Sequence, residues 1–431
     1  MREMKDSGIK WIGSIPLGWE ITRVKNVAKT MQSGGTPDSS NDSFYVNKEE
    51  GIPWVAIADM SNTPYVKETS RYISEEGRKS KNLIIFKPGT ILYAMYASVG
   101  KVAELVVPAT INQALLAIEL NGCISNAFFK YALNAWEPYI ISESNGTTQF
   151  NLNANKVANL YFPMPKRAEQ ENIVQYLNIK YKQINNLVSN IQAQIEKLKS
   201  YKQSLITDVV TKGLNHKVPM KNSGIDWIGK VPDRWDIIKL KYITYISRGL
   251  FNHRPRNDPN FYDGKYPFIQ TGDVARAEKY ITTYSQTLNE NGIQVSKQFP
   301  KGTITMTIAA NVGDVAILGF DAYFPDSVVG FTVKDGYDEN YVYYLFKALK
   351  ESFVRSSIVS TQLNLNIDRA KEIIVPITYD KVEQKKIASY LEVKCSQVDN
   401  LIAIKESKIK KLEQYKRSLI YEYVTGKKRV S

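Results

Sequence analysis

The chain offers few side chains at the spacings that catalysis or metal binding requires. His216 and His253 are its only histidines, and neither lies at triad or metal-ligand spacing from another candidate. Its two cysteines, Cys123 and Cys395, are too few for a disulfide framework or a four-ligand zinc site. We therefore expect no catalytic residue and no metal ligand in this chain.

Some segments approach enzyme signatures and then depart from them. Gly224 to Lys230 fits the start of a phosphate-binding loop, but Val231 replaces the magnesium-binding hydroxyl and Pro232 blocks the helix that should follow. Asp258 to Phe261 lacks the second proline of the Asp/Asn-Pro-Pro-Tyr/Phe tetrapeptide of DNA amino-methyltransferases, and no glycine-rich loop for the methyl donor is recognisable. The pattern leaves nuclease carboxylates open, yet no Pro-Asp pair precedes a clear Glu-x-Lys strand. We interpret these pairs as turns: Pro37-Asp38, Pro232-Asp233 and Pro325-Asp326.

Several polar loops instead carry the side chains that read DNA. They mix glycine and small polar residues with Arg, Lys, Asn and Gln, which contact base edges and phosphates. Ordinary solvated loops would have a similar composition, so this alternative stays open. The candidate DNA-binding residues are Gly34, Thr36, Arg78, Lys79, Lys81, Gln149, Arg248, Asn252, His253, Arg254 and Gln362.

The bulk composition agrees with a globular protein that has a polyanionic partner. The chain has 431 residues, 43% of them hydrophobic, and carries a net charge of +14. No apolar run approaches the ~18 residues needed to cross a bilayer, and the start lacks an apolar signal core. We expect a cytoplasmic protein with no membrane contact.

These loops must be positioned by a scaffold, and the sequence contains that scaffold twice. Ser7 to Ile21 and Ser223 to Ile237 are identical at nine of fifteen positions, two of which are tryptophans. Similar matches follow at near-constant offset, ending with ten identities in seventeen positions between Ile195–Thr211 and Ile409–Thr425. Lys29–Glu50 and its counterpart share little. One scaffold thus carries two different working surfaces.

The pattern of each copy predicts a mixed α/β domain followed by a long helix. Expected strands are Ile52–Ala58, Thr90–Tyr96, Pro267–Thr271 and Thr303–Ala309, and expected short helices are Ala127–Ala135 and Asn340–Lys350. Prolines at 163, 165 and 376 close the domains.

The long helices carry seven-residue apolar repeats. The first repeat comprises Leu177, Ile184, Ile191, Leu198 and Leu205, widened by Leu187, Val188, Ile195 and Tyr201. The second comprises Leu391, Val398, Lys405, Leu412 and Leu419, widened by Leu401, Ile402, Ile409 and Tyr415. Because each stripe needs a partner, we expect an antiparallel intramolecular coiled coil. Lys405 is either a snorkelling lysine or a position that sets the register.

These features together resemble a known family. Trp-Ile-Gly-x-Ile/Val-Pro-x-x-Trp opens each copy at Trp11 and Trp227, and Glu169-Gln170 or Glu383-Gln384 opens each long helix after the prolines. This duplicated order resembles the specificity subunit of type I restriction–modification systems over essentially the whole chain. The single proline at 376, where the first copy has two, is one departure.

The resemblance implies an α+β fold with an internal pseudo-two-fold repeat. It implies target-recognition domains at 1–165 and 214–380, a central helix at 166–213 and a distal helix at 381–431, which form an antiparallel coiled coil. The function implied is the non-catalytic reading of a bipartite, asymmetric site on double-stranded DNA. The implied partners are two modification (methyltransferase) subunits and restriction (endonuclease and translocase) subunits. S-adenosylmethionine, ATP and Mg²⁺ are then expected on those partners, with no cofactor in this chain.

The charge and the long helices also fit a different class of function. A stand-alone DNA-binding regulator or scaffold would share the charge and the helices, although it would not need two unlike reading domains. Copurification with a larger protein that carries Asn-Pro-Pro-Tyr/Phe would separate the two interpretations.

Overall fold

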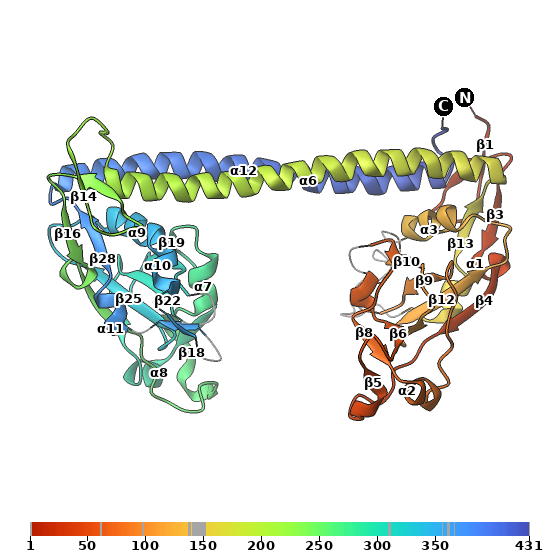
Figure 1. Cartoon of the computed structure of the whole chain (residues 1–431), viewed down its shortest axis with the longest axis horizontal. Helices are drawn as coiled ribbons and strands as arrows, with labels where there is room; N and C mark the ends of the chain where they lie inside the picture. The colour runs from red at the N-terminus through yellow and green to blue at the C-terminus, as the bar shows by residue number, and fades with distance from the viewer. Residues whose placement is uncertain are drawn as a thin grey trace. The chain divides into compact units, whose positions relative to one another are not determined.

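The computed structural model describes residues 2–60, 63–96, 99–136, 139, 152–308, 312–355, 357–359, 363–365 and 367–430. The chain forms two compact units. Unit 1 comprises Met1–Ile191 and Ser407–Ser431, and unit 2 comprises Gln192–Glu406. Each unit contains one α/β domain and a part of two long helices, α6 (Arg167–Lys212) and α12 (Lys381–Val424) (Figure 1).

The domain of unit 1 is built on two sheets. The five-stranded sheet has the order β4 (Ala28–Ser33), β12 (Leu115–Leu120), β9 (Ile91–Ala94), β10 (Val102–Leu105), β7 (Tyr65–Val66). The four-stranded sheet has the order β11 (Thr110–Ile111), β6 (Ile52–Val55), β8 (Arg71–Ile73), β5 (Tyr45–Val46). Strand β9 is buried on both faces, because Ile91 and Tyr93 share a core with helix α3 (Asn126–Ala135) while Leu92 and Ala94 belong to a second core with Val55.

The domain of unit 2 repeats the five-stranded sheet and three strands of the second sheet, whose fourth strand lies at the opposite edge. Its five-stranded sheet has the order β17 (Thr244–Arg248), β25 (Val328–Val333), β22 (Ile304–Thr307), β23 (Val315–Leu318), β19 (Tyr280–Ile281). Its second sheet has the order β20 (Gln286–Leu288), β18 (Tyr262–Phe268), β24 (Ala322–Tyr323), β21 (Gln298–Phe299), and helix α9 (Glu339–Ala348) corresponds to α3. The register is repeated too, since Ser33 lies opposite Leu116 and Arg248 lies opposite Val329, the residue equivalent to Leu116.

Smaller elements complete both domains. The paired short strands are β1 (Met4–Asp6) with β2 (Ser14–Pro16), β3 (Glu20–Arg23) with β13 (Tyr161–Met164), β14 (Met220–Asn222) with β15 (Lys230–Pro232), β16 (Asp236–Lys239) with β28 (Ile374–Ile377), and β26 (Ser357–Val359) with β27 (Leu363–Leu365). The other α-helices within the described residues are α1 (Val24–Val27), α2 (Glu75–Ser80), α5 (Ala154–Ala158), α7 (Thr271–Arg276), α8 (Glu290–Gln294), α10 (Lys350–Arg355) and α11 (Ile367–Lys371).

The repeated tryptophan and the Glu-Gln pair together hold the start of each long helix. In unit 1 the Trp19 indole Nε1 donates to Glu169 Oε2 at 2.8 Å, and the Arg2 guanidinium donates to the same carboxylate at 2.6 Å. In unit 2 the Trp235 indole donates to Glu383 Oε2 at 3.2 Å. The amide of the following glutamine, Gln170, bonds to the backbone at Ser125 and Pro165. The motif that opens each copy therefore anchors a helix some 150 residues later in the chain.

The two long helices run antiparallel, as contacts inside each unit show. In unit 1 the Tyr176 and Tyr423 rings lie 4.5 Å apart, and Lys416 Nζ donates to Asn185 Oδ1 at 3.0 Å. In unit 2 Lys202 Nζ lies 2.6 Å from Asp399. Lys405 is half-buried and donates to Gln194 Oε1 at 2.6 Å, so the break in the apolar stripe carries a polar pair. The antiparallel coiled coil is confirmed.

Some expected details were wrong. Ala56 to Ala58 do not continue β6, because Ile57–Met60 form a 3₁₀ turn in which Asp59 Oδ2 accepts from the Ala56 N–H. Strand β18 begins earlier than expected and ends at Phe268. In the coiled coil, Ile184, Ile191 and Ile195 are buried, but four residues expected to widen the stripes are exposed by 48–55%: Leu187, Tyr201, Leu401 and Tyr415. The expected domain boundaries stay a prediction.

Candidate DNA interface

A glycine at the end of the first sheet strand brings two loops together in both copies. An added Cβ at Gly34 would lie 1.9 Å from the Ile111 carbonyl oxygen, and one at Gly249 would lie 2.2 Å from the Pro325 carbonyl oxygen. The Gly34 N–H donates to Leu115 O, and the Gly249 N–H donates to Val328 O, which is the equivalent residue. Only glycine allows this close approach, so the same loop pair is built into both domains.

In unit 1 the predicted residue Thr36 lies in this loop pair. Its hydroxyl donates to Gln113 Oε1, and the loop is fixed by the Trp54 indole, which donates to Gly35 O at 3.0 Å. Gly34 and the exposed Lys81 line the same small cavity of about 190 Å³. The structure therefore brings three of the predicted unit 1 residues to one end of the domain.

Arg78 and Lys79 lie on α2, close to Lys81 in the chain. The Arg78 guanidinium donates to Glu75 Oε1 at 2.6 Å and to the Leu83 carbonyl at 2.9 Å. The hydrogen bond to Glu75 raises the pKa of Arg78 further. Arg78 thus holds the turn that presents Lys81, while Lys79 is exposed and 3.7 Å from Glu75.

In unit 2 the loop pair contains an arginine cluster around one carboxylate. Asp326 lies 2.7 Å from Arg256 and 3.8 Å from Arg254, and its backbone carbonyl accepts from Arg248 Nε at 2.6 Å. Arg254 also donates to the Phe251 carbonyl at 2.8 Å. Arg248 and Arg254 were predicted, whereas Arg256 and Asp326 were missed. The signal was present in Pro325-Asp326, which we interpreted only as a turn.

His253 is held as part of the same loop. Its ring stacks on Phe261 with centroids 4.0 Å apart, and its Nε2 lies 3.0 Å from Asp258 Oδ2. A hydrogen bond from the Asn260 backbone N–H, and a smaller contribution from the hydrogen bond with His253, lower the pKa of Asp258. Asn252 is exposed next to it. The predicted Gln149 and Gln362 lie outside the described residues.

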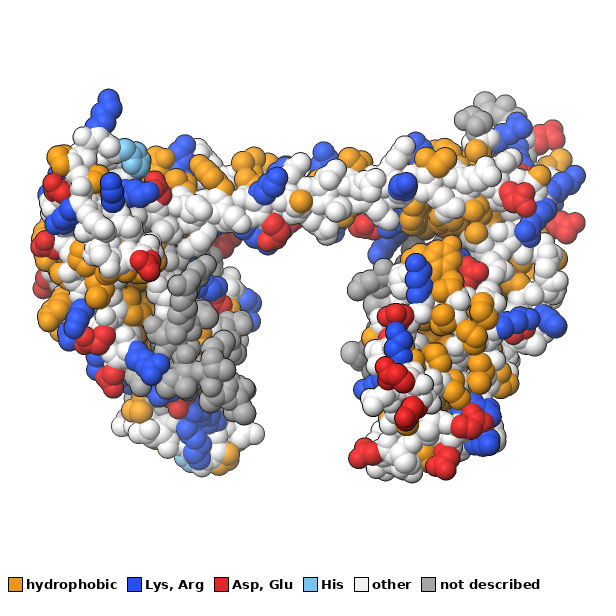
Figure 2. Space-filling model, in the orientation of Figure 1, with side chains coloured by type: hydrophobic (Ala, Val, Ile, Leu, Met, Phe, Trp, Pro, Cys, Tyr) orange, Lys and Arg blue, Asp and Glu red, His pale blue; other side chains and the backbone are white. Residues whose placement is uncertain are grey.

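The two loop pairs are equivalent in backbone and unlike in side chains. Gln113 and Asp326 occupy the same position of the repeat, as the shared contacts of Gly34 and Gly249 establish. Gln113 meets a hydroxyl, whereas Asp326 meets three arginines. Lys and Arg side chains also lie at the end of the unit 2 domain that is away from the long helices (Figure 2).

Comparisons with known proteins identify the family. The model of the type I restriction modification DNA specificity domain matches residues 16–197 and again residues 232–414. This chain belongs to the type I restriction modification DNA specificity family. The double match corresponds to the two copies of the repeat and covers both loop pairs.

Several members of the specificity family are similar over long stretches. The chain is 23% identical over 430 residues to the type I restriction enzyme MjaVIII specificity subunit of Methanocaldococcus jannaschii, covering 96% of this chain and 94% of the relative. It is 22% identical over 330 residues to the Escherichia coli EcoBI specificity subunit, covering 74% and 66%. A solved chain from a study of complex assembly and conformational transition of the type I R-M system has a TM-score of 0.68 at 14% identity, covering 95% of this chain and 98% of that chain. That likeness concerns the fold.

No helix within the described residues is both long and apolar enough to span a membrane. No group of three or more His, Cys, Asp or Glu side chains among them is placed to hold a metal ion.

Proposed function

We propose that this chain reads a bipartite, asymmetric DNA site as the specificity subunit of a type I restriction–modification complex. The observation that carries the proposal is the pair of equivalent loops, which present Thr36 and Gln113 in one domain and an arginine cluster around Asp326 in the other. Arginine pairs bidentately with guanine, whereas neutral side chains suit other base edges. Two unlike surfaces on one scaffold fit two unlike half-sites.

Catalysis then belongs to partner subunits. The relatives are named specificity subunits of restriction enzymes, and this naming favours a partner-dependent role over a stand-alone regulator. We propose that modification subunits supply S-adenosylmethionine-dependent methylation, and that restriction subunits supply ATP- and Mg²⁺-dependent translocation and cleavage.

The exposed apolar residues of the coiled coil support two copies of the modification subunit. Leu187 and Leu401, at equivalent positions of the repeat, are exposed by 51% and 48%, and Tyr201 and Tyr415 by 55% and 51%. Hydrophobic side chains are visible along the helices (Figure 2). A surface that occurs twice on one chain fits two copies of one partner.

The test is methylation mapping with the purified complex of this chain and its modification subunit. The proposal predicts methylated adenines at a site whose two half-sequences differ and are separated by a fixed gap. Methylation at a palindrome, or no sequence preference, would contradict it.

A further inference from the structure

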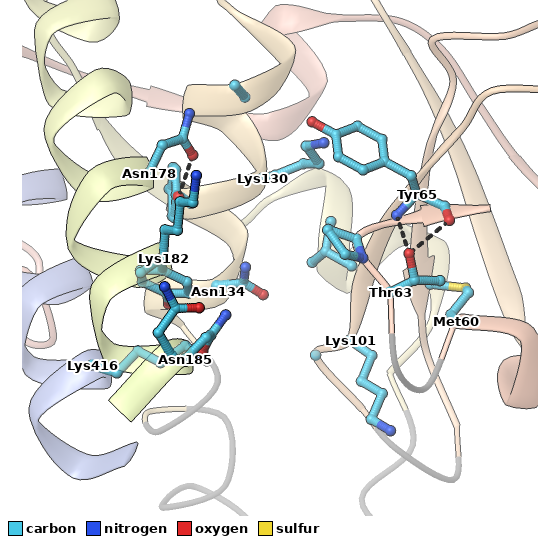
Figure 3. Close-up of a pocket in the computed structure, with 17 residues that line it drawn as sticks. Met60, Thr63, Tyr65, Lys101, Lys130, Asn134, Asn178, Lys182, Asn185 and Lys416 are labelled. Carbon is cyan, nitrogen blue, oxygen red and sulfur yellow. Dashed lines mark hydrogen bonds between the residues drawn. The ribbon is translucent and has the colours of Figure 1, made fainter. Parts of the chain in front are cut away.

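A groove of about 760 Å³ lies in unit 1 between the domain and the long helices (Figure 3). Asn178, Lys182 and Asn185 of α6 line one side, and Tyr65 and Lys101 line the other (Figure 3). Its lining includes four lysines and four asparagines, and no Asp or Glu is among the described residues that line it. None of the residues that line the groove belongs to the unit 1 loop pair.

Two asparagines of the groove have their amide oxygens engaged. Asn178 Oδ1 accepts from the Tyr131 hydroxyl at 2.8 Å, and Asn185 Oδ1 accepts from Lys416 Nζ at 3.0 Å. Because both amide oxygens are engaged, the amide N–H₂ groups are left to donate. A donor-rich, positively charged groove suits a ligand with anionic acceptor oxygens.

Among the described residues, two of the four lysines have no carboxylate within ion-pair distance. Lys130 pairs with Glu104 at 2.6 Å, and Lys416 lies 3.7 Å from Glu413. Within the described part of the chain, the Lys101 and Lys182 ammonium groups make no ion pair and no hydrogen bond. Their charge is therefore available to a ligand.

The second copy has the same packing, with acidic side chains at three of the positions where unit 1 has lysine or asparagine. Tyr344 donates to Glu392 at 3.3 Å as Tyr131 does to Asn178, and Lys202 pairs with Asp399 at 2.6 Å as Lys416 bonds to Asn185. At the four equivalent positions, unit 1 has Lys101, Asn178, Lys182 and Asn185, and unit 2 has Asp314, Glu392, Ser396 and Asp399. The formal charge is thus +2 in unit 1 and −3 in unit 2.

The carboxylates of unit 2 show which charges the shared fold requires. In unit 2 each carboxylate is neutralised within the chain: Asp314 by Lys350, Asp399 by Lys202 and Glu392 by Lys279. Since the shared fold accommodates either set of side chains, packing does not require the positive charge of the unit 1 groove. A positive charge that the fold does not require can serve the binding of a ligand.

We propose that the unit 1 groove binds the sugar–phosphate backbone of the target DNA, in a contact that the second copy lacks. The inference rests on the proposed function, because it takes DNA to be the anionic ligand. Phosphate contacts position a protein on DNA without reading bases, and lysine and asparagine side chains commonly make them. The groove contacts with the DNA phosphates are therefore made by unit 1 and not by unit 2, although the two domains share one fold.

The test compares a double variant of the full chain with a matched control, both assembled with the modification subunit. In Lys101→Ser with Lys182→Ser, the groove loses both unpaired charges, and serine is the residue that the second copy has at position 396. The control is Lys197→Ser with Lys410→Ser, which removes two exposed helix lysines outside the groove. Binding to duplexes with and without the target site is measured from 0.05 to 0.5 M salt. Over this range the logarithm of the binding constant falls linearly with the logarithm of the salt concentration, because binding releases counterions. Each lost phosphate contact lowers the steepness of this dependence, the salt slope, by ~0.9.

The groove variant should lower the slope by ~1.8 and the affinity by ~30-fold at 0.15 M salt, equally for target and non-target duplexes. Neutral methylphosphonates placed one at a time in either strand should weaken the control at particular phosphates and leave the groove variant unaffected there. If the groove variant matches the control on both measures while target recognition persists, the proposal is wrong and the proposed function stands. Intact DNA affinity with lost binding of the modification subunit would assign the groove to an acidic protein segment instead. Absence of specific DNA binding by the unaltered complex would refute the proposed function itself.

Discussion

Replacing Asp326 by Asn should relax base discrimination in one half-site and leave the fold intact. The carboxylate lies 2.7 Å from Arg256 and 3.8 Å from Arg254, and these side chains are 34%, 49% and 56% exposed. Because such exposed pairs stabilise a fold by only ~0–1 kcal/mol, the free energy of unfolding should change by less than ~1 kcal/mol. The loss should appear in recognition.

The expected size follows from the local charges. Three arginines and one aspartate give the cluster a formal charge of +2, and the substitution raises it to +3. The extra unpaired charge should steepen the salt slope by ~0.9 and strengthen binding to non-target DNA. Loss of a positioned bidentate contact should cost ~1–3 kcal/mol at one base pair, which is a ~5- to 150-fold loss of discrimination.

The assay is competition binding by the complete complex against duplexes with single base changes in each half-site. Glu372→Gln is the matched control, because this carboxylate also holds two cations, Lys239 at 2.5 Å and Lys241 at 2.6 Å, in the same domain and away from the loop pair. Their hydrogen bonds lower the pKa of Glu372 to about 2. Relaxation at both half-sites, or equal behaviour of the two variants, would refute the positioning role of Asp326.

Three further predictions follow from the fold. Gly34→Ala should destabilise unit 1 by ~1–3 kcal/mol and impair its half-site, whereas Gly18→Ala, whose Cβ would meet nothing within 4 Å, should not; thermal unfolding and methylation mapping measure both. Burial opposes ionisation of Glu169, but hydrogen bonds from Arg2 and Trp19 outweigh it and lower its pKa, so Glu169→Gln should cost ~1–2 kcal/mol near pH 7. That difference should shrink as the pH falls below the ordinary value of 4.5, and a constant difference in urea unfolding from pH 3 to 7 would contradict the linkage. Four residues inserted after Asn190 lengthen α6 by ~6 Å and should widen the mapped gap between half-sites by one or two base pairs of ~3.4 Å, with both half-sequences retained.

The architecture could be predicted because the sequence contains the same unit twice. Repetition of the tryptophan motif and of the heptads constrained the domains and the coiled coil, and each copy corroborated the other. The contact that joins them, Trp19 to Glu169, spans 150 residues and could not be read from local pattern. The exposed Leu187 and Tyr201 show a second limit. Apolar periodicity indicates which residues avoid water, but a surface awaiting a partner has the same periodicity as one already buried.

The position of the candidate site could be predicted from the sequence, but the contacts of its side chains could not. Glycine and basic residues marked the loops at Gly34 and Arg248, yet the equivalence of Gln113 and Asp326 depends on the loop that each glycine touches, some 75 residues away. Side chains such as Arg78 satisfied the composition rule while serving the fold, since a guanidinium has the same donors for a carbonyl as for a base.

Internal duplication offers a control that a single domain lacks. A residue that the fold requires should recur in both copies, as Trp19 and Trp235 do, with their glutamate acceptors. A residue that serves one DNA half-site or one phosphate contact has no reason to recur. The positions of Lys101, Asn185 and Gln113 are occupied in the second copy by Asp314, Asp399 and Asp326. The differences that survive identical packing are therefore where asymmetry of recognition should be sought, and both the loop pairs and the unit 1 groove contain such differences.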